Sequence, residues 1–392
     1  MTKVVLAAPG ADRYGSDLQL LESARALRSA GCRVNAFVPE SGPLVPMLED
    51  LGVDVRVLPV PVLRRTDKSV RGLVVLAARL SIALPRMIFA LLRVRPDVVY
   101  VNTVTIPWWT LAARLVGRRA VVHVHEAESQ DSRGARLALY LPLVLATRII
   151  MISTAARDAA VGTIPRIGSR AIIVRNGVPD RPSPPAIRQR GSVLQVGVVA
   201  RLSPRKGTMD ALEIAAKLAS TTPVQLHLFG DVFPGYEWYE EELKARASRP
   251  DLARLVTFHG YTRPVWNALD DLDLVLAPSH VEPFGNSVVE AQLSQRVVVA
   301  SEAEGHLESI EHGVTGFHYP IGDIEAAVRC IEGIVSDGEL AQAVALRARD
   351  SALRNNGTDA YRGGLLAALE IPQDSLAPIP SDRSRPITGE MS

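Results

Sequence analysis

The residues best suited to chemistry stand in one short stretch, LAPSHVEPFGNSVVEAQ, which spans residues 276–292. An apolar run leads into this stretch and predicts a buried strand, and a helix is predicted to begin inside it. The loop between strand and helix supplies three candidate contacts, Phe284, Gly285 and Asn286. Backbone N–H groups at a helix N-terminus lack partners within the helix and attract anions, so this loop is suited to hold a phosphate.

Two carboxylates, Glu282 and Glu290, flank that loop at a spacing of eight residues. A carboxylate repels a bare phosphate but accepts hydrogen bonds from sugar hydroxyls. The loop and its two carboxylates therefore suit a ligand that carries both a phosphate and sugars.

A second candidate stretch is RLSPRKG, residues 201–207, which follows a strand predicted over 193–200. Arg201 and Lys206 stand five residues apart around a Pro-Gly loop. Arginine offers a planar fork of donors and lysine a compact charge, so the pair is suited to clamp a diphosphate. An ordinary structural turn is the alternative for this motif taken alone, and the presence of the first stretch favours the phosphate clamp.

A third stretch, VVHVHE at residues 121–126, predicts a strand that ends in His125 and Glu126. No further histidine or carboxylate stands at ligand spacing, so we predict no metal site here. We expect His123 to pack in the core. For His125, a histidine satisfied within an interdomain loop stays open beside a role toward a ligand.

These stretches resemble the signature of the retaining glycosyltransferases of family 4. EPFGNSVVEA carries the two glutamates of that family, and RLSPRKG carries its Gly-Arg-Leu…Lys-Gly motif with Ala200 in place of the first glycine. Further matches in the same order extend the resemblance over roughly residues 3–370. The resemblance implies an α/β protein with the GT-B fold, in which two Rossmann-like doubly wound domains face each other across a cleft.

The resemblance also implies a hexosyltransferase that uses a nucleotide-diphosphate sugar as co-substrate and needs neither a metal nor another cofactor. Glu290 would bind the ribose, Glu282 the hydroxyls of the donor sugar, and His125 the transferring sugar. Arg201 and Lys206 would neutralise the departing diphosphate. The implied catalytic residues are His125, Arg201, Lys206 and Glu282, and the implied donor-binding residues are Gly15, Asn176, Arg201, Lys206, Gly230, Glu282, Phe284, Gly285, Asn286 and Glu290.

Three of these assignments have a plain structural alternative. The first loop lacks the Gly-x-Gly-x-x-Gly pattern and keeps only Gly15, followed by Ser16, so an ordinary strand–helix turn stays open there. Asn176 precedes Gly177, and Asn-Gly is first of all a turn former. Gly230 ends a predicted strand, and we expect it to act through its backbone.

A chain of 392 residues is long for a single core, so we expect two domains. We predict an N-terminal acceptor domain over 1–178, a proline-rich linker over 179–192 and a nucleotide-sugar domain over 193–357. We also predict a helix over 358–370 that crosses back to the first domain, and a disordered tail over 371–392.

The two cysteines, Cys32 and Cys330, lie in opposite halves and indicate a reducing compartment. The first residues are typical of a strand and its loop rather than of a signal peptide, so we expect a cytoplasmic protein. Residues 1–190 hold 27 Lys and Arg against 14 Asp and Glu, and the rest holds 17 against 28. The basic half could face anionic lipid or a phosphate-bearing acceptor, or arginine could simply be common in this proteome.

The apolar segment over 71–95 carries arginines at intervals of seven or eight residues and contains Pro85. These interruptions argue against a transmembrane helix. Two alternatives stay open, a basic amphipathic helix on an anionic membrane at the inner face of the plasma membrane and a core-packed helix with a solvated arginine stripe. The first favours a lipid-linked glycan or glycolipid as acceptor, as in cell-envelope polysaccharide synthesis, and nothing indicates nucleic acid as a partner.

Three other functions compete with glycosyl transfer. A GT-B sugar-nucleotide epimerase would use the donor without an acceptor, and the EPFGNSVVE stretch argues against it. A catalytically silent sugar-nucleotide-binding subunit stays open because the glycine pairs are altered at Gly15-Ser16 and Glu304-Gly305. A dinucleotide-dependent dehydrogenase is disfavoured because the first loop lacks its glycines.

Overall fold

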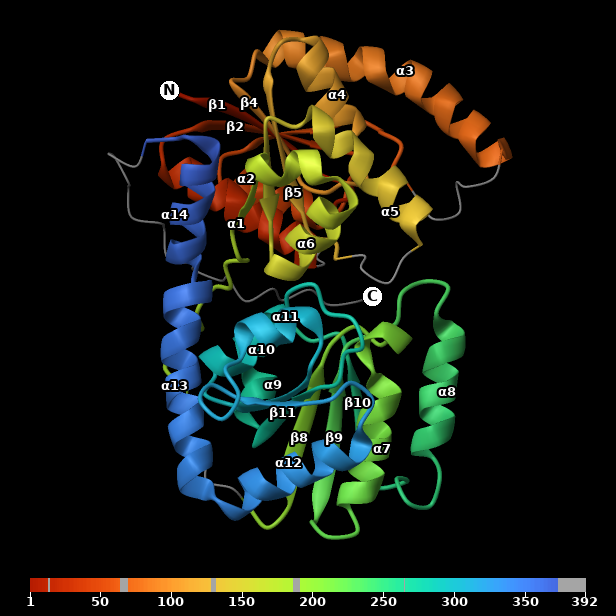
Figure 1. Cartoon of the computed structure of the whole chain (residues 1–392), viewed down its shortest axis with the longest axis vertical. Helices are drawn as coiled ribbons and strands as arrows, with labels where there is room; N and C mark the ends of the chain where they lie inside the picture. Colours follow the sequence, from red (N-terminus) through yellow and green to blue (C-terminus); the bar gives the residue numbers. More distant parts are fainter. Residues whose placement is uncertain (13–14, 64–69, 128–131, 186–190, 264, 373–392) are drawn as a thin grey trace.

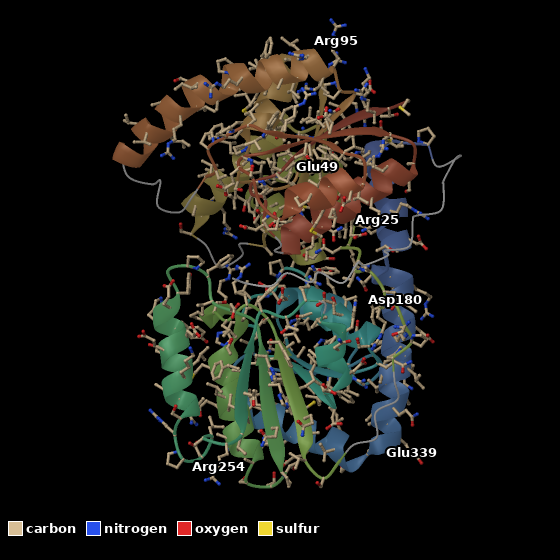
Figure 2. All side chains as sticks on the ribbon, turned by 180° about the vertical axis from the view of Figure 1, so that it is seen from behind. Arg25, Glu49, Arg95, Asp180, Arg254 and Glu339 are labelled. Carbon is tan, nitrogen blue, oxygen red and sulfur yellow. The ribbon has the colours of Figure 1, made fainter. Side chains whose placement is uncertain are left out.

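The computed structural model describes the chain except for residues 13–14, 64–69, 128–131, 186–190, 264 and 373–392. For residues 70, 71 and 73 it describes the backbone alone. The chain forms two α/β domains that lie one above the other along the long axis of the molecule (Figure 1). Arg95 marks the outer end of the first domain, and Arg254 and Glu339 mark the outer end of the second (Figure 2).

Apolar runs make the core of the first domain. Its described strands form one parallel sheet in the order β3-β2-β1-β4-β5-β6-β7. A strand covered by helices on both faces is apolar along its whole length, as in the fully buried Val-Val-Tyr-Val of β4. The strands are β1 Lys3–Ala7, β2 Arg33–Val38, β3 Asp54–Val57, β4 Val98–Val101, β5 Arg119–Val124, β6 Arg148–Met151 and β7 Ala171–Ile173. The helices are α1 Gly15–Ser29, α2 Leu44–Asp50, α3 Val70–Val94, α4 Trp108–Leu115, α5 Arg133–Tyr140, η2 Leu141–Leu145, α6 Thr154–Thr163 and η3 Pro165–Arg170.

The second domain repeats this design in the order β10-β9-β8-β11-β12-β13. Its strands are β8 Leu194–Val199, β9 Val224–Phe229, β10 Val256–Gly260, β11 Leu274–Ala277, β12 Val297–Ser301 and β13 Phe317–Tyr319. Its helices are η4 Pro204–Lys206, α7 Thr208–Leu218, α8 Glu237–Ala247, α9 Trp266–Asp270, α10 Asn286–Leu293, α11 Glu304–Ser309, α12 Ile324–Ser336 and α13 Gly338–Asn356. In both sheets the strand order reverses once, at β1/β4 and at β8/β11, and such switch points are where open α/β sheets bind ligands. The predicted fold class is confirmed.

The last helix, α14 Thr358–Leu369, packs on α1 and joins the core of the first domain. Its Tyr361 lies deep in that core, and the hydroxyl contacts Ser23 Oγ at 2.6 Å. Ser23 Oγ also lies 3.2 Å from the Tyr100 hydroxyl and donates to the Gln19 carbonyl oxygen at 2.9 Å. A buried polar chain therefore fixes the C-terminal helix to α1 and β4, although the rest of the contact is apolar.

The predicted linker is only partly the exposed spacer that its prolines indicate. Arg181 is buried, and its guanidinium donates two hydrogen bonds to the Asp270 carboxylate, at 2.6 and 2.7 Å. Asp180 accepts from Arg349 of α13 at 2.8 Å and lies at the junction of the two domains (Figure 2). The chain segment after the first domain is thus held against the second by ion pairs at Asp180 and Arg181.

Helix α3 lies along the outer rim of the first domain and reaches beyond it (Figure 1). Ala83, Met87 and Leu91 are buried against the domain. The opposite face is exposed and mixes apolar side chains with arginines, namely Val74, Val75, Arg79, Ile82, Arg86, Phe89, Leu92 and Arg93. By length and composition, Val74–Val94 is the one helix among the described residues that could cross a membrane. The core-packed alternative therefore describes only one face of α3.

The Tyr361 hydroxyl gives a test of how α14 is anchored. Tyr361→Phe keeps the ring and removes one buried hydrogen bond, so we expect the free energy of unfolding to fall by about 1 kcal/mol. Urea unfolding followed by circular dichroism measures this. The matched control is Tyr236→Phe, because the Tyr236 side chain is exposed and should change stability little. Equal stability of wild type and Tyr361→Phe would show that the apolar contacts alone anchor the helix.

Candidate functional site

A cleft of about 980 Å³ lies between the two domains at the carboxyl ends of both sheets. This volume suits a ligand larger than a single sugar. All eleven residues predicted for the site line the cleft, and they come from six strand ends and two helix N-termini. They are Gly15, His125, Asn176, Arg201, Lys206, Gly230, Glu282, Phe284, Gly285, Asn286 and Glu290. Their roles toward a ligand stay predictions.

Glu282 is a buried charge of the cleft, and Lys206 is its direct partner. The Ser279 hydroxyl donates to the same carboxylate at 3.3 Å, and His306 Nε2 lies 3.8 Å from it. Burial by itself raises the pKa of Glu282, but Lys206, His306 and Ser279 outweigh burial and lower it. The carboxylate is therefore ionised at neutral pH and can accept hydrogen bonds from hydroxyl groups.

The loop from Glu282 to Asn286 is shaped by two glycines. Gly285 caps α10 with φ +96°, a conformation that L side chains rarely adopt. Gly305 packs on the loop so tightly that a Cβ there would lie 2.5 Å from the Phe284 Cα. The Gly305 N–H also donates to the Glu282 carbonyl oxygen at 2.8 Å. The N-terminus of α10 is therefore held open toward the cleft.

Glu290 lies one turn into α10 and accepts a hydrogen bond from Arg263 at 2.9 Å. Burial raises the pKa of Glu290, and Arg263 only partly offsets that effect. Sequence analysis missed Arg263, which stands in the loop after β10. Its one signal in the sequence is its place a few residues after the run LVTF at 255–258, in Tyr-Thr-Arg-Pro.

Arg201 lies with its guanidinium carbon 3.3 Å from the centre of the Phe233 ring. An aromatic face attracts a cation and restricts where the guanidinium can lie. Phe233 follows β9 in the loop that begins at Gly230, and it also lines the cleft. Gly230 has φ +142°, and a Cβ there would meet the Ala200 carbonyl oxygen at 1.9 Å, so this position requires glycine. Sequence analysis missed Phe233.

His125 is a side chain that the first domain places in the cleft. Burial lowers its pKa to about 3, so the ring is neutral at physiological pH. Its Nε2 lies 3.1 Å from Asn102 Oδ1, and the His123 ring packs behind it at 4.1 Å between centroids. His123 is fully buried, as predicted from the strand pattern.

Several polar side chains near His125 line the first-domain side of the cleft. Glu126 accepts from the His125 backbone N–H at 2.9 Å and from the Thr103 hydroxyl. Thr105 and Asp12 also line this side. The oxygen atoms of these side chains suit a ligand rich in hydroxyl groups.

Two contacts bridge the domains at the edge of the cleft. Asn176 Nδ2 donates to Asn286 Oδ1 at 3.0 Å. Glu308 of α11 accepts from the Ala155 backbone N–H at 3.2 Å and from the Thr154 hydroxyl at 3.1 Å. Glu308 is therefore placed as a bridge to the N-terminus of α6 rather than as a lining residue of the cleft.

No group of three or more His, Cys, Asp or Glu side chains that could hold a metal ion occurs within the described part of the chain.

Two family models match consecutive parts of the chain. The model "Glycosyl transferase 4-like domain" matches residues 15–182, and "Glycosyl transferases group 1" matches residues 185–351. Together they cover most of the two domains.

Curated relatives match over part of their length. The chain is 33% identical over 170 residues to the lipopolysaccharide core biosynthesis glycosyltransferase LpsE of Rhizobium meliloti, covering 42% of this chain and 47% of that protein. It is 30% identical over 155 residues to the putative glycosyltransferase EpsD of Bacillus subtilis, covering 40% of each. The chain thus matches less than half the length of these relatives.

Solved structures match over nearly the whole chain. Anabaena Alr3699/HepE in complex with UDP-glucose superposes with a TM-score of 0.80 at 22% identity, covering 94% of this chain and all of that one. The lipopolysaccharide outer core galactosyltransferase WaaB superposes with a TM-score of 0.69 at 16% identity, covering 94% and 99%. At these identities the likeness shows a shared fold.

The Lys206–Glu282 pair gives a test of the electrostatics of the cleft. Lys206→Met leaves the buried Glu282 carboxylate without its cation, so we expect a loss of about 2 kcal/mol of stability at neutral pH. The variant also raises the folded-state pKa of Glu282 above its unfolded value. The loss should therefore shrink as the pH falls and vanish where the carboxyl is protonated in both states.

Thermal unfolding between neutral and acid pH measures this effect. Lys217→Met is the matched control, because Lys217 pairs with Glu325 on the exposed surface and should change stability little. Lys206→Met/Glu282→Gln should recover part of the loss. A loss that does not depend on pH would contradict the assignment to an uncompensated charge.

Proposed function

The chain belongs to the glycosyl transferases of group 1, with the GT-B fold, and from that premise we propose that it transfers a sugar from a nucleotide-diphosphate sugar to an acceptor with retention of configuration. One observation carries the proposal: a buried ionised carboxylate, two cations and an open helix N-terminus converge in a single cleft. A sugar diphosphate needs each of them, since hydroxyls bind carboxylates and phosphates bind cations and backbone N–H groups.

The donor would lie along the second domain. Glu290 would accept hydrogen bonds from the ribose, and Arg201 and Lys206 would contact the diphosphate. Glu282 and the N-terminus of α10 would hold the sugar, with His125 reaching it from the first domain. HepE was solved with UDP-glucose, so a UDP-hexose is the donor that we propose to test first.

Catalysis in this arrangement would rest on positioning and charge. The acceptor oxygen bonds to the anomeric carbon of the sugar as the bond from that carbon to the diphosphate breaks. The departing phosphate oxygen takes the proton of the acceptor hydroxyl on the same face of the sugar. Arg201 and Lys206 would stabilise the negative charge that develops on the leaving group. Closure of the cleft between two domains would exclude water, which competes as an acceptor.

We further propose that the protein works on a membrane surface and that its acceptor is a lipid-linked glycan or glycolipid. The outer face of α3 supports this, because it exposes large apolar side chains beside Arg79, Arg86 and Arg93. A helix of this kind lies in the interface of an anionic bilayer. Its inner face packs on the domain, which favours a helix lying on the membrane over one that crosses it. The location that we propose is the cytoplasmic face of the plasma membrane.

Nucleotide binding tests the donor site. A nucleotide at about 100 times its dissociation constant should stabilise the wild type by roughly 2.7 kcal/mol. Thermal shifts with UDP, GDP, dTDP and ADP measure this, and Glu290→Ala should abolish the shift because the ribose contact is lost. Glu339→Ala is the matched control, since Glu339 is exposed at the far end of the second domain (Figure 2). If no nucleotide stabilises the wild type, the proposed donor site is refuted, and the proposed transfer with it.

Vesicle binding tests the membrane proposal. The wild type should cosediment at low salt with vesicles that contain phosphatidylglycerol and not with vesicles of phosphatidylcholine alone. Each arginine near an anionic surface adds about 1 kcal/mol, so Arg79→Glu/Arg86→Glu/Arg93→Glu should weaken binding at least about a hundredfold. The control reverses Arg249, Arg254 and Arg354, which are exposed on the second domain and should leave binding intact. Equal loss in both triple variants would refute α3 as the contact.

A further inference from the structure

Asn102, a residue with no assigned role, connects the sugar-facing histidine to the first loop. It directly follows β4 and is fully buried. Its Nδ2 donates to the Ser16 carbonyl oxygen at 2.9 Å, and its Oδ1 lies 3.1 Å from His125 Nε2. A carbonyl oxygen can only accept, so the Ser16 contact fixes which side of the amide carries the nitrogen. The oxygen then faces the imidazole.

This amide orientation decides the protonation of His125. Oδ1 only accepts, so Nε2 must carry the hydrogen and donate it. A neutral imidazole has one N–H, so Nδ1 keeps a lone pair. Nδ1 bonds to no described residue, and the part-exposed His125 lines the cleft, where a ligand can reach this nitrogen.

We infer that Asn102 is a positioning residue that holds His125 as the Nε2–H tautomer, so that Nδ1 accepts a hydrogen bond from a hydroxyl of the donor sugar. The inference rests on the proposed function and specifies its substrate class. Glu282, on the facing wall, also only accepts. A sugar that presents hydroxyl groups to both satisfies them, whereas the carboxylate of a uronic acid would set its lone pairs against theirs. The donor is therefore a neutral hydroxylated sugar.

The groups around His125 agree with a neutral ring. His123 packs behind it, and Tyr100 and Tyr361 lie beyond His123 from β4 and α14. Glu126 is the charged neighbour, and its carboxylate accepts from the backbone N–H rather than from the ring. Among the described contacts, the one to the ring nitrogens is that of Asn102, and it sets the tautomer.

Nitrogen NMR of the full chain labelled with ¹⁵N-histidine tests the inference without any substrate. His125→Gln identifies the His125 resonances. We expect a neutral Nε2–H tautomer for wild-type His125 at pH 7. A dominant Nδ1–H tautomer would overturn the inference, whatever becomes of the variants.

Two substitutions separate positioning from a structural role. Asn102→Asp keeps an acceptor for Nε2, so the tautomer should persist while the carboxylate raises the pKa of His125 from about 3 by about 1–3 units. Asn102→Leu removes the acceptor, so Nδ1–H should become populated without that rise. Both Asn102 variants lose the hydrogen bond to the Ser16 carbonyl oxygen. Each variant is therefore the control for that loss in the other. Asn35→Leu is a further control, as Asn35 is buried and bonds Asp54 instead. Identical histidine spectra in the two Asn102 variants would overturn the inference.

The activity measurement is the pH dependence of kcat/KM for UDP-glucose hydrolysis. In Asn102→Asp the activity should fall as the pH drops through the raised pKa of His125, because protonated Nδ1 no longer accepts. Asn102→Leu should be slower at every pH without this acid limb. UDP-glucuronic acid should bind the wild type at least tenfold more weakly than UDP-glucose, and equal binding would refute the substrate class. If no donor is used while the tautomer is as expected, the proposed function fails and the role of Asn102 in setting the tautomer stands.

Discussion

The cleft depends on one electrostatic constraint, which is that the Glu282 carboxylate is removed from water. A buried charge must be paired and hydrogen-bonded, and the pair must be held by rigid elements. Lys206 comes from the loop after β8 and Glu282 from the loop after β11, so the ion pair bridges the switch point of the second sheet. Close packing brings the two loops together, because a Cβ at Gly207 would lie 1.9 Å from the Pro278 carbonyl oxygen. The same packing thus places a cation and a carboxylate together in the cleft, as the proposed sugar-diphosphate donor requires.

The sequence predicts the strands and the residues at their ends because both follow from short-range patterns. Each buried strand is a run of apolar residues, and in a parallel sheet the polar residue after such a run lies at the carboxyl edge. Residues found this way, such as His125 and Arg201, lie in one cleft although they are far apart in the sequence. The motif resemblance sharpened this prediction by naming the two glutamates.

Residues missed by sequence analysis act through partners that only the tertiary structure supplies. Arg263 is one example, because it donates a hydrogen bond to Glu290, which stands 27 residues later on another element. Asn102 has a role only because β4 and β5 are neighbours and α1 begins beside them. The burial of Arg181 is a similar case. The composition of the segment around it predicts an exposed linker, and only the tertiary structure brings Asp270 opposite its guanidinium. Local patterns contain no information on such pairs.

The two domains are joined by contacts of unequal strength. Helix α14 inserts Tyr361, Leu365, Leu366 and Leu369 into the first core, and burying such side chains contributes roughly 1.5–3 kcal/mol each. Across the cleft, Asn176 meets Asn286 by a single hydrogen bond worth about 1 kcal/mol. Glu308 adds hydrogen bonds at the N-terminus of α6 and a 3.6 Å ion pair with the part-exposed Arg175. The apolar anchor of α14 is therefore stronger than these polar contacts, and beside them Ile152 and Ala156 of the first domain pack against Phe284 and Val289 of the second in a further apolar cluster.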